Sequence, residues 1–529
     1  MVEFVRCHIF MAVAAALLLA VPMTRTAAAP RDPERETRLL HGVQRQYPGP
    51  LWIRDGKPTV QARGLLAVLR HVDDFGLSRA DFADQATTLD ASLDPLDAPR
   101  LEEAMTRAAL RLMSQLHDGR VDAATAGYRL SRRRAPVDFV RMVGVLSTSN
   151  DIDATLAALE PRASQFRALK MALAKYRRIP DAFAPLQPAR SVRADDAYAG
   201  AARLRQRLAE LGDATGAAEP QSPPDLYDAA LAQAVAHFQA RHGLQPDGVL
   251  GSRTLAALAV PMSRRIRQIE LTMERWRWLP DLHPPTVIVN VPQFMLYTLT
   301  ESREQVQVRK MTVIVGKSLN QTPVFDSAIE AVVFRPYWDV PRSILVNELL
   351  PLIERHPDYL ARNDMEIVRG GGESAQVLPE GPAAIAALRE GRARLRQRPG
   401  PKNALGLIKF VLPNPYAVYL HSTPEAALFA RDRRALSHGC IRVSDPTALA
   451  AYLLKDTSGD WSADAIEAAT CADTTLTVRL AKPVPVFILY GTAVVDEGEV
   501  LFFDDIYGYD RRLDALLTGA RAAALSAPP

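Results

Sequence analysis

Residues 421–446 read HSTPEAALFARDRRALSHGCIRVSDP, and they hold one of only three cysteines in a chain of 529 residues. Cys440 follows Ser-His-Gly, and His421 opens the stretch. A cysteine in this setting serves as half of a disulfide, as a metal ligand or as a nucleophile. The compartment in which the protein works and the types of the neighbouring residues bear on the choice between these roles.

The N-terminus has the features of a secretory signal peptide over residues 1–29. Arg6 precedes an unbroken apolar run over residues 9–21, and an Ala-x-Ala cleavage site follows at residues 27–29. The apolar run is short for a membrane span. An uncleaved N-terminal anchor is the alternative interpretation, and both interpretations predict that the rest of the chain is exported.

Composition narrows the classes of function. The chain carries 64 basic and 60 acidic residues, so its net charge of +4 lacks the basic excess expected of a nucleic-acid-binding protein. Its length predicts roughly two to four domains. Export favours disulfides between paired cysteines, yet removal of the signal with Cys7 leaves only Cys440 and Cys471. A free thiol kept in an oxidising compartment needs a reason, and catalysis supplies one.

Residues 30–190 predict a helical scaffold domain. Apolar residues recur at three- and four-residue spacing in stretches such as LEEAMTRAALRLMSQLHDGRV, which is the pattern of an amphipathic helix. His41, His71 and His117 stand alone, without a partner in a familiar catalytic or metal-binding spacing. We therefore expect these histidines to be ordinary surface or core residues.

Residues 196–262 predict a second, smaller helical unit. Within it, one apolar helix face is formed by Leu231, Ala234, Val235 and Phe238. Gly243 follows as the residue that ends this helix. The pattern F-Q-x-x-x-G-L-x-x-D-G-x-x-G-x-x-T in this unit closely resembles the peptidoglycan-binding domain type 1. A helical spacer that binds no ligand is the alternative, since a fold does not guarantee its usual function.

The spacing of apolar residues changes near residue 285 from the helical pattern. From there to residue 510, short stretches rich in Val, Ile, Thr and aromatic residues predict a mostly β domain. Strand patterns stop over residues 341–402, where helical stretches flank a run of three glycines. A long insert beside a site often acts as a lid, and a surface decoration is the alternative. Residues 511–529 are expected to form a C-terminal tail. The predicted fold class is therefore multidomain α+β.

Three roles of Cys440 remain open from the residue types alone. Zinc sites usually contain closely spaced ligand pairs, and His421, His438 and Cys440 complete no familiar pattern. A disulfide to Cys471 is the second role, although Cys471 resembles a small buried hydrophobe near a helix end. A nucleophile needs a base that lowers the thiol pKa, and Gly439 permits a turn whose amide N–H groups hold an oxyanion.

The string H-S-x14-S-H-G-C-I-R-V resembles the active-site signature of the L,D-transpeptidase (YkuD) family. The stretches QTPVF, YWDVPRSI, NALGLIKFVLPNPYAVYLHSTP and VPVFILYGTA extend this resemblance over about residues 285–510. Together with the other two units, the layout resembles the large periplasmic L,D-transpeptidases of Gram-negative bacteria. The resemblance implies a periplasmic enzyme that acts on peptidoglycan and requires no metal or other cofactor.

The resemblance also implies a role for each matching residue. Cys440 is the expected nucleophile and His421 the base that activates it. The backbone carbonyl of Ser422 is expected to orient the imidazole, so its side chain is expected to be dispensable. The oxyanion hole and the walls of the site are expected at His438, Gly439, Ser437 and Arg442. Arg442 is also expected to hold a substrate carboxylate. Substrate-facing aromatics are expected at Tyr419 and Trp338, with ordinary core residues as the alternative.

The implied reaction is acyl transfer from a tetrapeptide stem of peptidoglycan. Cys440 attacks the bond between meso-diaminopimelate and the terminal D-Ala, and the amine of a second stem resolves the thioester into a 3–3 cross-link. Attack by water would make the enzyme an L,D-carboxypeptidase, and attack by a protein lysine would make it an anchoring transferase. A non-catalytic wall-binding scaffold is the remaining alternative. Carbapenems are expected to acylate Cys440. Arg335 departs from the family, which often has Asn before the following proline, and this bears on contacts of the insert.

Overall fold

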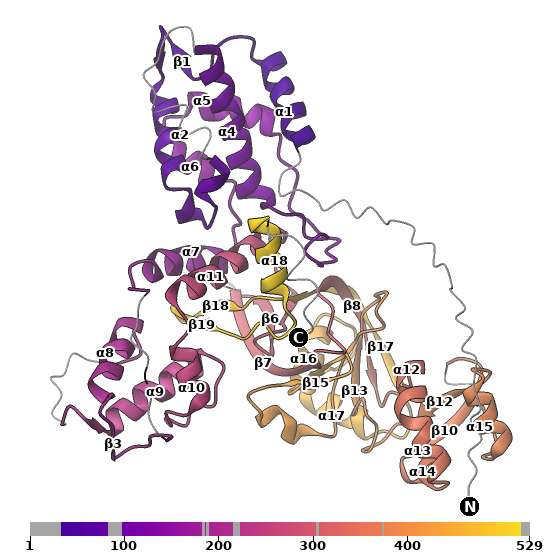
Figure 1. Cartoon of the computed structure of the whole chain (residues 1–529). Coiled ribbons are helices and arrows are strands. Elements are labelled where there is room, and N and C mark those ends of the chain that lie inside the picture. Colours follow the sequence, from indigo (N-terminus) through magenta and orange to yellow (C-terminus); the bar gives the residue numbers. More distant parts are fainter. Residues whose placement is uncertain are drawn as a thin grey trace, which may run out of the picture.

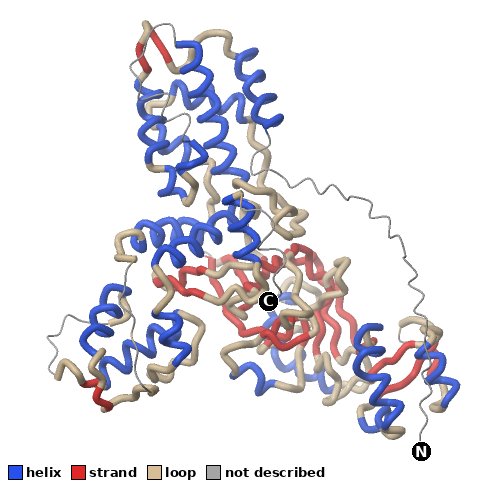
Figure 2. The backbone as a smooth tube through the Cα atoms, viewed as in Figure 1, coloured by secondary structure: helices blue, strands red, loops and turns tan. Residues whose placement is uncertain are grey.

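The computed structural model describes residues 33–82, 98–181, 186, 190–214, 223–302, 306–372 and 375–519. The predicted signal peptide lies outside the described residues. Figure 1 shows a helical bundle at the top, a small helical unit at the lower left, a β-rich body at the lower centre and a projecting insert at the lower right. Figure 2 shows most of the strands in the central body and the insert, whereas the bundle and the small unit are mostly helical. The multidomain α+β class is confirmed.

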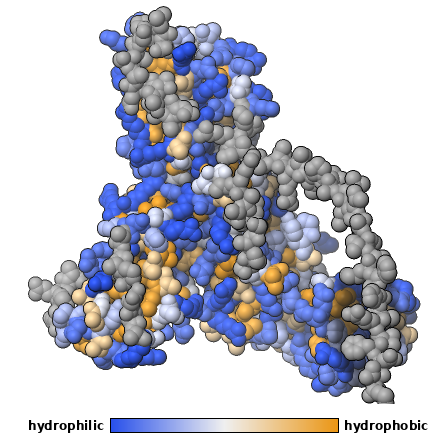
Figure 3. All heavy atoms as spheres, viewed as in Figure 1, coloured by the Kyte–Doolittle hydropathy of each residue, from blue (hydrophilic) through white to orange (hydrophobic). Residues whose placement is uncertain are grey.

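The bundle at the top forms the predicted helical scaffold. Its helices are α1 (Pro33–Gln46), α2 (Val60–Arg70), α4 (Ala98–Asp118), α5 (Phe139–Thr148) and α6 (Ile152–Ala157). In α4, three- and four-residue spacing buries Leu101, Met105, Ala108, Leu112 and Leu116. Hydrophilic residues cover most of the bundle surface in Figure 3. The core of the bundle ends at Leu159, well before the predicted boundary at residue 190.

The small helical unit contains α8 (Ala201–Leu211), α9 (Ala229–Arg241) and α10 (Ser252–Leu258). The predicted apolar face of α9 is buried, and Asp228 caps this helix by accepting a hydrogen bond from the Leu231 amide. Gly243 follows α9 with a φ of +63°, a backbone conformation that favours glycine. The predicted helix, its face and its end are therefore confirmed.

The small unit shares its core with elements from other parts of the chain. These elements are α7 (Ser164–Tyr176), α11 (Met262–Arg277), β18 (Ala493–Asp496) and β19 (Glu499–Phe502). Arg241 in α9 donates to the Val500 carbonyl at 2.8 Å and forms a buried ion pair with Asp213. The unit is therefore packed against the β-rich body, and the boundary expected at residue 262 falls at the first residue of α11.

The β-rich body is built on a nine-stranded sheet whose order is β15-β7-β16-β14-β13-β8-β17-β5-β6. Because β7 also pairs with β6, the sheet closes on itself around an apolar core. The strands are β5 (Thr286–Asn290), β6 (Met295–Glu301), β7 (Val306–Gly316), β8 (Phe325–Phe334), β13 (Ile408–Val411), β14 (Leu420–His421), β15 (Ala435–Ser437), β16 (Ile441–Val443) and β17 (Leu476–Leu489). Helices α16 (Pro446–Leu454) and α17 (Ala463–Cys471) pack beside it.

A segment between α4 and α5 leaves the bundle and joins the β-rich body. Val121, Tyr128 and Leu130 belong to the core of the sheet. The Arg129 amide donates to the Val324 carbonyl at 3.0 Å, and the Trp278 indole donates to the Val121 carbonyl at 2.9 Å. Sequence periodicity does not reveal that a segment of one unit packs into the core of another. It shows which face is apolar and not what covers that face.

The insert differs from the purely helical segment that was predicted. Its helices are α12 (Arg342–Ile344), a π-helical turn (Leu345–Leu349), α13 (Leu350–Arg355), α14 (Tyr359–Arg362) and α15 (Pro382–Arg389). A separate four-stranded sheet contains β9 (Trp338–Asp339), β10 (Met365–Arg369), β11 (Gln376–Val377) and β12 (Arg394–Gln397). The expectation that strands stop over residues 341–402 was wrong, because these strands are short and carry arginines. The insert also has its own apolar core.

The predicted C-terminal tail begins with a packed helix instead. Helix α18 (Tyr509–Thr518) buries Leu513 and Leu517 in the core of the β-rich body. Its Asp510 accepts a hydrogen bond from Thr492 at 2.6 Å and pairs with Arg275 of α11 at 2.6 Å. Among the described residues, no helix is both long and apolar enough to span a membrane.

If α18 is part of the folded body, Leu513→Ala should lower its free energy of unfolding by about 2–5 kcal/mol, because Leu513 is fully buried. Denaturant unfolding of the full chain, followed by tryptophan fluorescence, measures this change. Leu319→Ala is the matched control, since Leu319 is 89% exposed and its loss should change the free energy by less than about 0.5 kcal/mol. Equal effects of the two variants would show that α18 does not stabilise the body.

Candidate active site

Two short parallel strands bring His421 and Cys440 together. In the pairing of β14 with β16, Leu420 lies opposite Ile441 and His421 lies opposite Arg442. Leu420 and Ile441 are fully buried in the sheet core. Because side chains alternate along a strand, His421 and Arg442 face the other side of the sheet. Cys440 directly precedes Ile441, so it shares this outer face with His421.

The side chain of Cys440 is half-buried. Its Sγ is 3.9 Å from the Ala417 carbonyl oxygen. Burial raises the pKa of the thiol, while interactions with Tyr419, Lys409 and Arg442 act in the opposite direction. The lowered thiol pKa expected for a nucleophile is thus absent from the resting site. Both Cys440 and Cys471 are free, so no disulfide joins them, and Cys471 is exposed where a buried residue was expected.

His421 is held as a neutral base. Its Nδ1 lies 2.6 Å from the Ser422 carbonyl oxygen, and a carbonyl only accepts, so Nδ1 carries the proton and Nε2 is free to accept one. Burial and the neighbouring Arg442 lower the pKa of His421 to about 3. At neutral pH, both the imidazole and the thiol are therefore uncharged. The structure thus gives the Ser422 carbonyl the orienting contact that the sequence suggested.

The side chain of Ser422 has more contacts than its expected dispensability implies. Its hydroxyl accepts from the amides of Leu407 at 2.7 Å and Ile408 at 3.0 Å, and it donates to the Leu405 carbonyl at 3.1 Å. Gly406 makes this approach feasible, because a Cβ there would lie 2.2 Å from the hydroxyl oxygen. The hydroxyl therefore fixes the loop before β13 against the residue whose carbonyl orients His421.

The loop from Ser437 to Cys440 is fixed by its own hydrogen bonds. The Ser437 hydroxyl donates to the Cys440 carbonyl at 2.6 Å and accepts from the Gly439 amide at 3.1 Å. Gly439 has a φ of +119°, and its carbonyl accepts from the Thr322 hydroxyl at 2.8 Å. Since the Gly439 amide is already bonded, the amides of His438 and Cys440 are the remaining candidates in this loop for an oxyanion hole.

Two polar side chains of the signature contact carboxylates. His438 Nε2 lies 2.8 Å from a carboxylate oxygen of Glu348, which belongs to the π-helical turn of the insert. The insert therefore reaches the loop that carries Cys440. Arg442 pairs with Glu425. The Arg442 guanidinium, expected to hold a substrate carboxylate, is thus occupied by a carboxylate of the protein itself.

The two predicted aromatics lie near the pair. The Tyr419 ring packs edge-on against the His421 ring, with centroids 5.7 Å apart. Burial raises the pKa of the Tyr419 hydroxyl, whereas the Trp338 side chain beside it acts to lower this pKa. Trp338 lies in β9 of the insert sheet and is only partly buried. Both residues therefore lie at the site. Tyr419 belongs to the β-rich body and Trp338 belongs to the sheet of the insert.

Sequence reasoning missed three residues at the site. Lys409 lies opposite His421 in the pairing of β13 with β14. Thr322 holds the Gly439 carbonyl, and the Tyr507 hydroxyl donates to the Gly316 carbonyl at 2.5 Å and accepts from the Thr322 amide at 3.3 Å. The charged residue between apolar neighbours in LIKFVL was a usable signal for Lys409. Nothing local in the sequence links Tyr507 to this loop.

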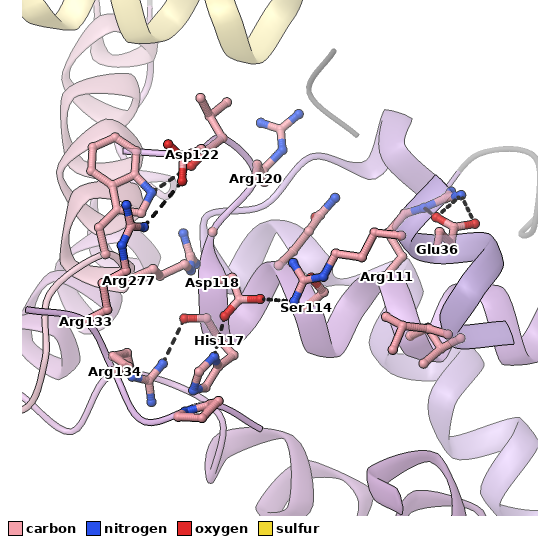
Figure 4. Close-up of a pocket in the computed structure, with 18 residues that line it drawn as sticks. Glu36, Arg111, Ser114, His117, Asp118, Arg120, Asp122, Arg133, Arg134 and Arg277 are labelled. Carbon is pink, nitrogen blue, oxygen red and sulfur yellow. Dashed lines mark hydrogen bonds and ion pairs between the residues drawn. The ribbon is translucent and has the colours of Figure 1, made fainter. Parts of the chain in front are cut away.

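A second polar hollow lies where the scaffold bundle meets the β-rich body, and Figure 4 shows its lining. This cavity of about 520 Å³ is rich in arginine. Its ion pairs include Arg35–Asp118 at 2.7 Å, Arg111–Glu36 at 2.9 Å and Arg133–Asp122 at 3.3 Å. The first two pairs join α1 to α4 within the bundle, and the third lies within the segment after α4. These pairs account for much of the charge in the hollow, so the candidate active site remains the one at Cys440.

Comparison with known proteins agrees with this geometry. Residues 284–480 match the family model of the L,D-transpeptidase (YkuD) catalytic domain. Residues 199–258 match a "Putative peptidoglycan binding domain", and residues 44–173 match a scaffold domain. The chain therefore contains an L,D-transpeptidase catalytic domain of the YkuD family, together with a peptidoglycan-binding domain and a scaffold domain.

A Haemophilus influenzae protein described as "Putative L,D-transpeptidase" is 33% identical to this chain over 251 residues. The matched region makes up 47% of this chain and 49% of the relative. The chain thus spans about half the length of the curated relative that it matches.

Ser422→Ala should lower the free energy of unfolding by about 2 kcal/mol or more, because buried amides of Leu407 and Ile408 lose their acceptor. Denaturant unfolding measures the loss. Ser458→Ala is the control, since Ser458 is exposed. A Ser422 variant as stable as this control would return the residue to the dispensable role suggested by the sequence.

Proposed function

We propose that this protein is an exported, periplasmic L,D-transpeptidase that forms 3–3 cross-links in peptidoglycan. The observation that carries the proposal is the pairing of β14 with β16, which sets a neutral, oriented His421 beside the half-buried Cys440 on one face of the sheet. The match of residues 284–480 to the L,D-transpeptidase catalytic domain supports the reaction class.

In the first step, the thiol proton of Cys440 moves to Nε2 of His421 as Sγ attacks the carbonyl carbon of diaminopimelate in the donor stem. Because His421 is neutral at working pH, it is able to accept this proton. The Ser422 carbonyl, bonded to Nδ1–H, favours the imidazolium that forms. The negative charge on the carbonyl oxygen is stabilised by amide N–H groups of the Ser437–Cys440 loop.

The imidazolium then returns its proton to the nitrogen of the terminal D-Ala, which leaves, and a thioester of Cys440 remains. The diaminopimelate amine of a second stem attacks this thioester. His421 takes the proton that the amine loses and passes it to the departing sulfur, so the free enzyme is restored. The proposed cycle needs no cofactor, because every proton and bond is exchanged between the substrates and these two side chains.

Water and a protein lysine are the competing acceptors, and they would make the enzyme an L,D-carboxypeptidase or an anchoring transferase. The contact between Glu348 and His438 supports an insert that covers the nucleophile loop. An insert that covers the thioester would exclude water and favour attack by a bound amine. The match of residues 199–258 supports a role for the smaller helical unit in holding the enzyme on peptidoglycan. A non-catalytic scaffold is disfavoured, because Cys440, His421 and the loop geometry are all present.

Incubation of the full chain with disaccharide-tetrapeptide should give a dimer that has lost one D-Ala, detected by mass spectrometry. Cys440→Ala should abolish this product because no thioester forms. A carbapenem should add its mass to Cys440 in the unmodified protein and leave the variant unchanged. Tripeptide without dimer would identify a carboxypeptidase, and the absence of both products and of the carbapenem adduct would refute the proposal.

Opening of the insert should favour hydrolysis. Glu348→Ala removes the contact with His438, and replacement of residues 341–402 by a short glycine linker removes the cover. The ratio of tripeptide to dimer should rise several-fold in both variants. Glu354→Ala is the control, since Glu354 lies in the same insert and pairs with Arg389, away from the loop. An unchanged ratio in both variants would contradict a lid that excludes water.

A further inference from the structure

Lys409 lies on the catalytic face of the sheet and no sequence signature marked it. Its neighbours Ile408 and Phe410 are buried in the core, so alternation along β13 turns Lys409 to the opposite face. The pairing of β13 with β14 sets Lys409 directly opposite His421. Cys440 lies on the same face, directly before β16, which is the neighbour of β14 on the side away from β13.

The ammonium group of Lys409 is unusually placed for a lysine. Its Nζ lies 4.3 Å from the centre of the Tyr419 ring, a cation–π contact. Burial lowers the pKa of Lys409, while Asp339 and Cys440 act to raise it. Among the residues that the structure describes, no carboxylate lies within ion-pair distance of Nζ. Lys170 and Lys310, in contrast, pair with Glu160 at 2.8 Å and Asp496 at 2.6 Å.

Even a partly buried cation such as Lys409 costs free energy when it has no carboxylate partner, unless another anion offsets it. The anion that can form beside Lys409 is the thiolate of Cys440. Of the other groups near Cys440, Tyr419 and His421 are uncharged at working pH, and Asp339 of the insert pairs with Arg394 at 2.8 Å. Arg442 is a second cation that acts on the sulfur, and it is paired with Glu425. Of the two cations, Lys409 is the one without a carboxylate partner among the described residues.

We propose that Lys409 is an electrostatic positioning residue whose ammonium ion stabilises the Cys440 thiolate while the thiol proton moves to His421. Lys409 keeps its own proton throughout, and Tyr419 holds Nζ in place through its ring. The proposal deepens the proposed function, since it rests on Cys440 as the nucleophile. It also explains how a buried, neutral thiol–imidazole pair reaches its reactive form, because the cation offsets the cost of a buried anion.

The test is the pH dependence of Cys440 alkylation by iodoacetamide in the full chain without substrate, followed by peptide mass mapping. The alkylation rate reports the thiolate fraction. Lys409→Met should raise the midpoint by about one pH unit and lower the rate near neutral pH by about tenfold. Lys409→Arg should retain most of the wild-type profile, because the charge is kept. Lys482→Met, an exposed lysine in β17 of the same sheet, should leave the profile unchanged.

Two outcomes would overturn the proposal. A wild-type midpoint in a folded Lys409→Met variant, with a raised KM for the tetrapeptide, would make Lys409 a substrate-binding residue instead. A midpoint as high in Lys409→Arg as in Lys409→Met would show that shape and not charge is required. Thermal unfolding establishes that each variant is folded. Because alkylation needs no substrate, a failure of cross-linking would count against the proposed function and leave this test intact.

Discussion

The parallel pairing of two very short strands, β14 and β16, is the constraint on which the site depends. It places Leu420 and Ile441 in the core, and His421 and Arg442, the residues that follow them, then face the other side of the sheet. A shift of one residue in either strand would bury His421 or Cys440 in the core and expose an apolar side chain. The burial of apolar side chains that stabilises the core therefore also fixes the relative positions of His421 and Cys440.

Burial also decides the charge state of that pair. It raises the pKa of the Cys440 thiol and lowers that of the His421 imidazole, so the resting pair is neutral. A neutral thiol is protected from oxidation, because the thiolate is the species that reacts. In the proposed mechanism, activation depends on the cations of Lys409 and Arg442 around the sulfur, and on the Ser422 carbonyl that favours the imidazolium.

The units of the chain are interlocked. The segment after α4 and helix α18 both contribute to the core of the sheet, and α7 and α11 link it to the peptidoglycan-binding domain. Tyr507, just before α18, bonds to the strand end and loop that hold Gly439. The nucleophile loop is thus supported from far along the chain, and the insert contacts the same loop through Glu348. Substitutions in several units can therefore alter the geometry of the candidate active site.

The sequence by itself determined the order of the units, the helices of the scaffold and the small domain, and the residues of the Cys440 signature. These features are local, because helix periodicity, capping residues and a short motif lie within a few residues of one another. Tertiary structure alone decided the strands of the insert, the packing of α18, the partners of Arg442 and His438, and the place of Lys409. These depend on which surfaces meet, and strand register brings together residues that no local pattern connects.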